Sequence, residues 1–479
     1  MTRPQVLPSA AARELELSGL DAVETAARIR SRELTASEVI EAAIGRAEAL
    51  APVLNAISAR DYERALERAK APGTGPLAGV PTFVKDLDDL AGVVNSYGSR
   101  AHLGNVTKRS SGLISKVLET GVIALGKSTT PEFGLTGTTE SLAFGPTRNP
   151  WSATHSPGGS SGGAAALVAA GVVPLAHGSD GGGSIRIPAS FCGLVGLKVS
   201  RERRFVPAGL DRLPLRVVTH GVVTRTVRDT AHFVAALDQL VASRRLPRIP
   251  LVQGPSKRRL RIGTFFTAPS GVTVHPDVSE TVSAAAQRCA ALGHKLEEIP
   301  CPFDEQMVED FLLYWSCLAW GSILQTRLQR GRGFDMETME PWTRNLAARF
   351  QARRGAALTT LKRLRAARTA SERLFQGYDL LLSATTTAPA PKLGYLGPDV
   401  PFDTVFARVR DYFCLTPPQN IIGNAAITLP MGMSQGGLPI GVHFAAHEGH
   451  ESTLLELAYE LEADGALCAV RAPGVYGAA

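Results

Sequence analysis

The sequence predicts an α/β fold built on a largely parallel or mixed sheet, and three observations lead to this class. Short apolar runs with β-branched residues at 81–85, 122–126 and 172–176 are typical of buried strands. Helical patterns lie between them, at 112–119 and 163–170. Strands that alternate with helices in this way form sheets covered by helices. The 479 residues, 44% of them hydrophobic, can bury a large core without disulfides.

The segment from residue 20 to residue 70 is expected to be mainly helical. Thr35 and Glu38 match a capping box, in which each side chain accepts a hydrogen bond from the other residue's backbone N–H. The apolar residues after this cap fall on one helical face: Ile40, Ala43, Ile44 and Ala47.

The second half of the chain continues the pattern with longer helical stretches. A strand is expected at 260–266 and an amphipathic helix at 281–292. Residues 300–400 are expected to be mainly helical. The tail is expected to form a hairpin over 427–442, followed by a helix over 451–461.

The composition argues against several classes of protein. The six cysteines have no C-x-x-C pair and no metal-ligand spacing, which favours reduced thiols in a cytoplasmic protein. Residues 1–13 lack the apolar core of a secretory signal, and the apolar stretch 164–176 is too short to span a bilayer. The formal charge is +7, but the basic clusters lack interleaved aromatic residues. We therefore expect no cofactor, no metal, no nucleic-acid partner and no membrane partner.

Two glycine-rich turns each carry serine. Residues 157–163 read PGGSSGG, and residues 179–188 read SDGGGSIRIP. The three glycines before Ser184 allow successive backbone N–H groups to converge, an arrangement suited to stabilising an oxyanion. Taken alone, each motif also fits a plain tight turn, and Ser160 or Ser161 also fits a helix N-cap.

Lys85 ends an apolar run and is the candidate base. Burial disfavours the charged form of lysine, so a buried amine can accept a proton from a serine directly or through a second hydroxyl. A carboxylate of Asp86 or Asp88 close to the ammonium would oppose this, although strand alternation sends Asp86 to the opposite face. The chain has no G-x-S-x-G elbow, and His177 is expected to have a structural role.

These residues and their surroundings resemble the amidase signature. The matching segments are 85–86, 126–132, 147–151, 158–163, 180–188, 191–198 and 429–441. The resemblance extends from about residue 20 to 465 and is weakest across 240–420. It implies a single α/β/α domain with a central mixed, twisted sheet covered by helices. Four segments are expected within it: an N-terminal helical segment (1–70), the signature core (71–240), a variable segment forming part of the substrate pocket (241–420) and a hairpin with a helix completing the core (421–479).

The resemblance also implies roles for individual residues in the hydrolysis of C–N bonds. Ser184 would be the nucleophile, Ser160 the bridging serine after a cis peptide bond, and Lys85 the base. The oxyanion hole would consist of the backbone N–H groups of Gly181, Gly182, Gly183 and Ser184. Asp180 and Arg186 would organise the turn from behind.

Two departures from the family pattern carry their own expectations. Gly181 stands where many members have a bulkier residue, which predicts a looser oxyanion hole. After Lys198 the chain reads VSRER and not PTxGR, which leaves the following loop and one wall of the pocket undetermined.

The substrate class follows from finer similarity within the family. Residues 147–151 and 184–190 look most similar to bacterial hydrolases of synthetic amides, including nylon-oligomer hydrolases, aryl acylamidases and urethanases. The expected substrates are small amides, including aryl carbamates, with water as the second reactant. Cys317 and Trp315 are expected to contact substrate, although both also fit core packing. The sequence leaves open whether two copies of the chain form a homodimer.

Three other functions compete with this one. The A subunit of a glutamyl-tRNA amidotransferase resembles the same signature and works with partner subunits. A nucleotide-binding protein would use the glycine turns for phosphate, but the chain has no G-x-x-x-x-G-K-[ST] motif. A binding protein without catalytic activity would keep the turns and lack a reactive serine.

Overall fold

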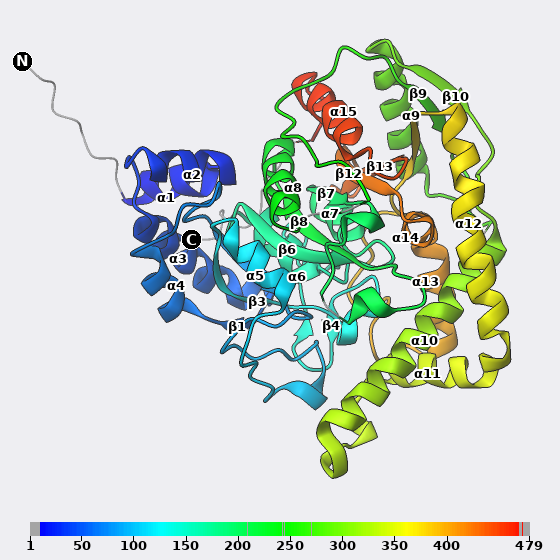
Figure 1. The fold of residues 1–479 in the computed structure, drawn as a ribbon, viewed down its shortest axis with the longest axis horizontal. Helices are drawn as coiled ribbons and strands as arrows, with labels where there is room; N and C mark the ends of the chain where they lie inside the picture. The colour runs from blue at the N-terminus through cyan, green and yellow to red at the C-terminus, as the bar shows by residue number, and fades with distance from the viewer. Residues whose placement is uncertain are drawn as a thin grey trace, which may run out of the picture.

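The computed structural model has an eight-stranded mixed sheet at its centre (Figure 1). The structure describes residues 10–468 apart from 208, 242, 244 and 270, and also residue 472. The strand order is β10 (Lys295–Glu298), β9 (Arg261–Thr264), β11 (Leu380–Ala384), β13 (Pro439–Ala446), β12 (Ala425–Met433), β7 (Val195–Lys198), β8 (Thr219–Thr224) and β6 (Leu175–Asp180). The pairs β10–β9 and β9–β11 are parallel and the others are antiparallel.

Two smaller sheets accompany it. One has the order β1 (Ile57–Arg60), β3 (Ile123–Ser128) and β2 (Pro81–Lys85), and the other pairs β4 (Glu140–Ser141) with β5 (Gly145–Pro146). Strand β2 lies beside β6, where the Thr82 hydroxyl donates to the carbonyl of Leu175 and the backbone N–H of Lys85 donates to the ring of His177. Side chains therefore join the small sheet to the edge of the large one.

Helices make up most of the remaining chain. Their bounds are α1 (Ala10–Gly19), α2 (Ala22–Arg30), α3 (Ala36–Leu54), α4 (Tyr62–Ala69), α5 (Gly112–Glu119), α6 (Gly162–Ala169), α7 (Arg186–Cys192), α8 (Val227–Val241), α9 (Pro276–Ala291), α10 (Glu305–Arg330), α11 (Pro341–Arg353), α12 (Ala357–Gly377), α13 (Phe402–Tyr412), α14 (Pro417–Ile422) and α15 (Glu451–Ala463).

The two largest apolar cores hold several of these helices on the sheet. The larger core joins strands of the large sheet to α8, α9 and α15, with Phe233, Val282 and Leu454 fully or almost fully buried. The second core joins α3 and α6 to residues of β2, β3 and β6. Helix α6 is buried along its whole length, which suits its run of alanine and glycine. The predicted α/β class, with one domain around a mixed sheet, is confirmed.

The segment 20–70 is mainly helical, as expected, but it also contains a short strand that was not predicted. Helix α3 begins with the predicted capping box of Thr35 and Glu38, and it ends where Asn55 takes a left-handed conformation with φ of 49°. The chain then enters β1, which pairs antiparallel with β3. This short strand lacks the alternating pattern that would distinguish it from a helix in the sequence.

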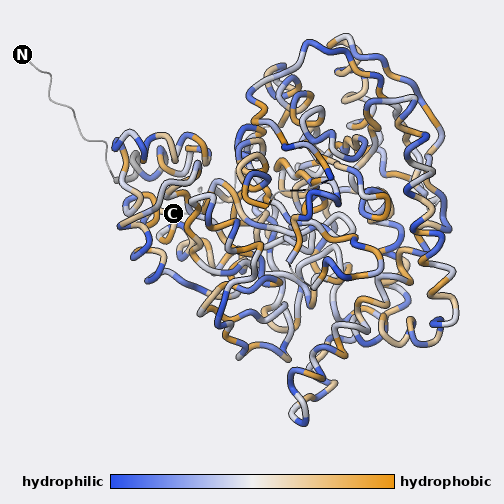
Figure 2. The backbone as a smooth tube through the Cα atoms, viewed as in Figure 1, coloured by the Kyte–Doolittle hydropathy of each residue, from blue (hydrophilic) through white to orange (hydrophobic). Residues whose placement is uncertain are grey.

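Helices α10, α11 and α12 lie together at one side of the molecule (Figure 1). Helices α10 and α11 pack together, and α12 follows along the edge of the molecule. Figure 2 shows many hydrophilic residues along α12, in agreement with its exposed position. Among the described residues, no helix combines the length and the apolar character that crossing a membrane requires.

Candidate active site

Three predicted residues lie on three different elements at one edge of the sheet. Lys85 is the last residue of β2, and Ser160 lies just before α6. Ser184 lies in the turn that joins β6 to α7. The turns that follow strands at a sheet edge are where α/β proteins usually bind ligands.

The amine of Lys85 is surrounded by hydroxyl groups. Its Nζ lies 2.7 Å from Ser160 Oγ and 2.9 Å from Ser161 Oγ. It also lies 3.1 Å from Ser179 Oγ and 3.3 Å from the carbonyl oxygen of Ser179. The side chain is 0% exposed, so the amine contacts these hydroxyls and not bulk water.

Burial lowers the pKa of Lys85 to about 7, against the opposing effect of the carboxylates of Asp88 and Asp180. A substantial fraction of the amine is therefore neutral near neutral pH, as a base requires. Asp86 points away, as strand alternation predicts: it lies 3.3 Å from Lys127 Nζ and accepts a hydrogen bond from Ser96.

The two serines before α6 do not cap the helix. Ser161 occupies the N-cap position, but its side chain makes no capping hydrogen bond. Its hydroxyl faces Lys85. The peptide bond between Gly159 and Ser160 is cis. A side chain at Gly159 would place its Cβ 2.3 Å from the carbonyl oxygen of Thr138, so close packing requires glycine here.

The turn around Ser184 is held by the carboxylate of Asp180. This carboxylate accepts hydrogen bonds from Gly183 N–H at 2.8 Å, from Ile185 N–H at 3.2 Å, and from two nitrogens of Arg186 at 2.9 Å each. Burial would raise the pKa of Asp180, but the Arg186 guanidinium holds it well below its ordinary value. Asp180 therefore stays ionised and fixes the turn.

One of the four N–H groups predicted for the oxyanion hole already has a partner. The N–H of Gly183 already donates to Asp180. No hydrogen bond within the described chain uses the N–H groups of Gly181, Gly182 or Ser184. These three N–H groups are available to a ligand, while Gly183, with φ of 125°, shapes the turn.

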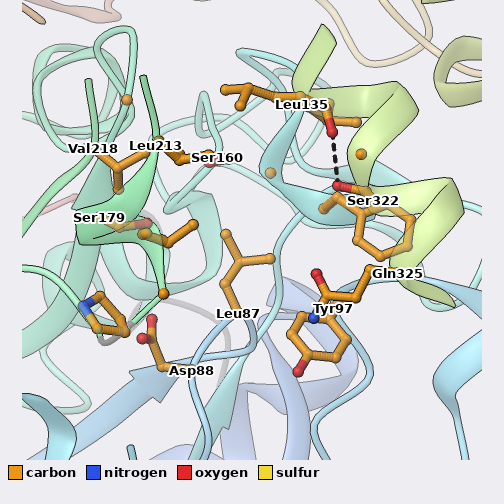
Figure 3. Close-up of a pocket in the computed structure, with 18 of the residues that line it drawn as sticks. Leu87, Asp88, Tyr97, Leu135, Ser160, Ser179, Leu213, Val218, Ser322 and Gln325 are labelled. Carbon is orange, nitrogen blue, oxygen red and sulfur yellow. Dashed lines mark hydrogen bonds between the residues drawn. The ribbon is translucent and has the colours of Figure 1, made fainter. Parts of the chain in front are cut away.

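A cavity of about 830 Å³ opens in front of these groups, and both Ser160 and Ser184 line it. Figure 3 shows Ser160 among the lining residues. Its walls are largely apolar and include Leu87, Leu213 and Val218. Ser184 also borders a much smaller cavity of about 60 Å³ that reaches Phe413. The nucleophile candidate thus has open space on two sides.

The two residues predicted to contact substrate both lie in the wall of the larger cavity. Trp315 and Cys317 belong to α10 and line this cavity. Burial raises the pKa of the Cys317 thiol, which keeps it in the neutral form. The expected looseness beside Gly181 is absent, because the indole of Trp315 fills the space that a side chain at that position would take.

Some residues of the site were not among the predicted site residues. Ser179, the first residue of the second glycine-rich turn, contacts Lys85, and Asp88 and His220 line the cavity. His177 has the structural role expected of it: it accepts a hydrogen bond from the backbone of Lys85 and lies 3.2 Å from His220. Only the pairing of β6 with β8 brings His220 to this place, so no local pattern could have identified it.

Comparison with known proteins agrees with this geometry. The family model for amidases matches residues 38–455. A putative amidase, AmiC, of Mycobacterium bovis is 41% identical over 463 residues, which cover 96% of this chain and 97% of that protein.

Two solved structures are similar over nearly the whole chain. That of 6-aminohexanoate cyclic dimer hydrolase complexed with substrate has a TM-score of 0.87 and 31% identity, covering 96% of this chain and 100% of its own. That of a bacterial aryl acylamidase has a TM-score of 0.80 and 27% identity, covering 93% of this chain and 96% of its own. These findings confirm the resemblance that the sequence motifs suggested.

Proposed function

This chain belongs to the amidase family, and we propose that it hydrolyses small amides and aryl carbamates with Ser184 as nucleophile, Ser160 as proton relay and Lys85 as base. The observation that carries the proposal is the 2.7 Å distance between Lys85 Nζ and Ser160 Oγ inside the protein, with Ser160 and Ser184 lining the same cavity.

The reaction begins when the Ser184 oxygen attacks the substrate carbonyl carbon. The Ser184 proton passes to Ser160, and the Ser160 proton passes to the neutral amine of Lys85. The negative charge on the carbonyl oxygen is stabilised by the N–H groups of Gly181, Gly182 and Ser184. A lost donor in such a site typically costs about 10²–10³ in turnover.

The relay then runs in reverse. Lys85 returns its proton through Ser160 to the leaving nitrogen, and the C–N bond breaks to give a neutral amine and an acyl- or carbamoyl-enzyme. Water attacks this ester while the relay removes the water proton. The bond between the Ser184 oxygen and the acyl carbon then breaks, and Ser184 takes back a proton from the relay, which restores the free enzyme. Every proton taken up by Lys85 is thus returned within the same turnover.

The walls of the cavity support aryl groups among the substrates. The aromatic side chains of Trp315, Phe133 and Tyr97 line it together with several leucines, and flat apolar walls suit aryl rings. The similar structures include an aryl acylamidase and a cyclic amide hydrolase. A carbamate offers the same carbonyl and leaving nitrogen as an amide, so the relay treats both alike.

The test is amine release by the purified chain from 4-nitroacetanilide, from an N-aryl carbamate and from a matching ester. We expect hydrolysis by wild type without added partner subunits, and labelling of Ser184 by a fluorophosphonate probe. Ser184→Ala should abolish both. An unlabelled but folded wild type would contradict the proposal. Activity that depends on added partner subunits would instead favour the amidotransferase role.

A further inference from the structure

The larger cavity has an unusual charge balance for so basic a protein. The chain carries a formal charge of +7, yet the lining residues that the structure describes include Asp88 and Asp89 and no lysine or arginine. Both carboxylates follow β2, close to Lys85 in the sequence. A cavity with this lining favours positive charge and disfavours negative charge in its ligand.

The carboxylate of Asp88 differs from its acidic neighbours because it receives no hydrogen bond from the described chain. Asp89 accepts one from Asn95 at 2.8 Å, and Asp86 faces Lys127. Asp88 is also buried, with only 3% of its surface exposed. A buried carboxylate without donors loses much of its solvation, so Asp88 stands ready for a donor that the protein does not supply.

Neither His177 nor His220 supplies that donor. His177 Nδ1 accepts the backbone N–H of Lys85 at 3.3 Å, so its proton is on Nε2, which faces His220 Nδ1 at 3.2 Å. His220 therefore carries its own proton on Nε2, and Nδ1 is an acceptor. Asp88 Oδ2 lies 3.5 Å from this same Nδ1. Burial lowers the pKa of both rings, to about 3 for His177, so both are neutral.

A metal ion is the first alternative for this cluster. Ligand atoms of Asp88, His177 and His220 lie within 4.8 Å of one another. A histidine that binds metal through Nε2 normally donates its Nδ1–H to an acceptor. Here Nδ1 of His177 faces a backbone N–H, which is a donor. The hydrogen bonds around the cluster therefore suit a ligand that brings its own protons.

We infer that the cavity recognises substrates carrying a protonated amine, which donates to the carboxylate of Asp88 while the scissile carbonyl lies at Ser184. This specificity rests on the proposed function. The substrate class is an amide or carbamate with an ammonium group remote from the C–N bond to be broken. Analogues with a carboxylate at the same position are excluded, because two negative charges would face each other in a poorly solvated site.

The test compares acyl 4-nitroanilides that differ only at the far end of the acyl chain. For each of several chain lengths, one compound ends in ammonium, one in methyl and one in carboxylate. At a pH well above the pKa of Lys85, but where the alkylamine is still protonated, wild type should show the order ammonium, methyl, carboxylate in kcat/KM. At the chain length with the highest kcat/KM, the ammonium compound should exceed the methyl compound by about tenfold or more. This factor corresponds to one charge-assisted hydrogen bond.

Asp88→Asn should reduce the ammonium-to-methyl ratio to near one. The ratio isolates specificity, because any effect of Asp88 on Lys85 acts equally on both compounds. The matched control is Asp89→Asn, which removes a cavity carboxylate that Asn95 already satisfies, and it should change the ratio much less. A ratio that Asp88→Asn leaves intact would overturn the inference.

Direct binding separates this inference from the proposed function. In calorimetry, an alkylammonium ion should bind wild type more tightly than the alcohol or carboxylate of the same length, even if no amide is hydrolysed. Equal binding of the three compounds by wild type would overturn the inference. Because this measurement uses wild type alone, it holds even if Asp88→Asn does not fold. Tight binding of Zn²⁺ that blocks alkylammonium binding and is lost in Asp88→Asn would assign the cluster to a metal instead.

Discussion

The indole ring of Trp315 occupies the space beside Gly181 that a side chain at position 181 would fill. A Cβ added at Gly181 would lie 3.0 Å from Cη2 of Trp315 and 3.1 Å from a methyl group of Val218. Trp315 is held by stacking on Phe311 and by a hydrogen bond from its Nε1 to the carbonyl of Leu135. A residue of α10 thus packs against the turn that carries Ser184.

We therefore expect Gly181→Ala and Trp315→Leu to depend on each other. Gly181→Ala alone should lower kcat, because the new methyl group has to displace either the indole or the turn that carries the three candidate oxyanion donors. Trp315→Leu should enlarge the cavity and raise KM for anilides. In the double variant the methyl group no longer meets the indole, so the two losses in kcat/KM should be less than additive by about 0.5–3 kcal/mol. Strict additivity would show that the contact has no functional effect.

The two serines beside Lys85 offer a matched pair of variants. Both hydroxyls lie within 3 Å of Lys85 Nζ, but only Ser160 lines the cavity with Ser184. Ser160→Ala should lower kcat by about 10²–10⁴, the usual contribution of proton transfer in the transition state. Ser161→Ala removes a hydroxyl that does not line the cavity, so its loss should be much smaller. Equal losses would contradict a relay through Ser160.

Activity should depend on pH through the amine of Lys85. The relay needs the neutral form, and burial places the pKa at about 7. For a neutral substrate, kcat/KM should fall about tenfold per pH unit below this value and level off above it. Because the Asp88 carboxylate stabilises the ammonium form of Lys85, Asp88→Asn should move this acid limb to lower pH. A limb that does not move would show that Asp88 and Lys85 are electrostatically independent.

The sequence identified the site residues that belong to short local motifs. Ser184 and Ser160 were recognisable because glycines that the packing requires surround them, and Lys85 because a charge ends an apolar strand. The other parts depend on pairing across the fold. His220 reaches Asp88 through the β6–β8 pair, and Trp315 reaches Gly181 from a helix more than 100 residues away. The hydrogen bond from Gly183 N–H to Asp180 could not be predicted from the sequence, because it depends on the backbone geometry of the turn.

A pair of buried glutamates makes stability depend on pH. Glu340 is 7% exposed and accepts a hydrogen bond from Leu142 N–H at 2.7 Å, while its own backbone N–H donates to Glu132. Burial, with a further effect of the Glu132 charge, raises the pKa of Glu340 from 4.5 to about 8. The folded state therefore keeps a proton that the unfolded chain releases above about pH 4.5.

This stabilisation is complete below pH 4.5 and is lost as the pH rises through about 8, at a total cost on the order of a few kcal/mol. Glu340→Gln keeps the side chain neutral and retains the acceptor for Leu142. We expect its urea midpoint to exceed that of wild type on the alkaline side of pH 8 and to match it near pH 5. The control Glu337→Gln, at an exposed position in the same segment, should show no such alkaline gain. A Glu340→Gln variant that is equally destabilised at both pH values would show that its carboxylate is ionised in the folded state.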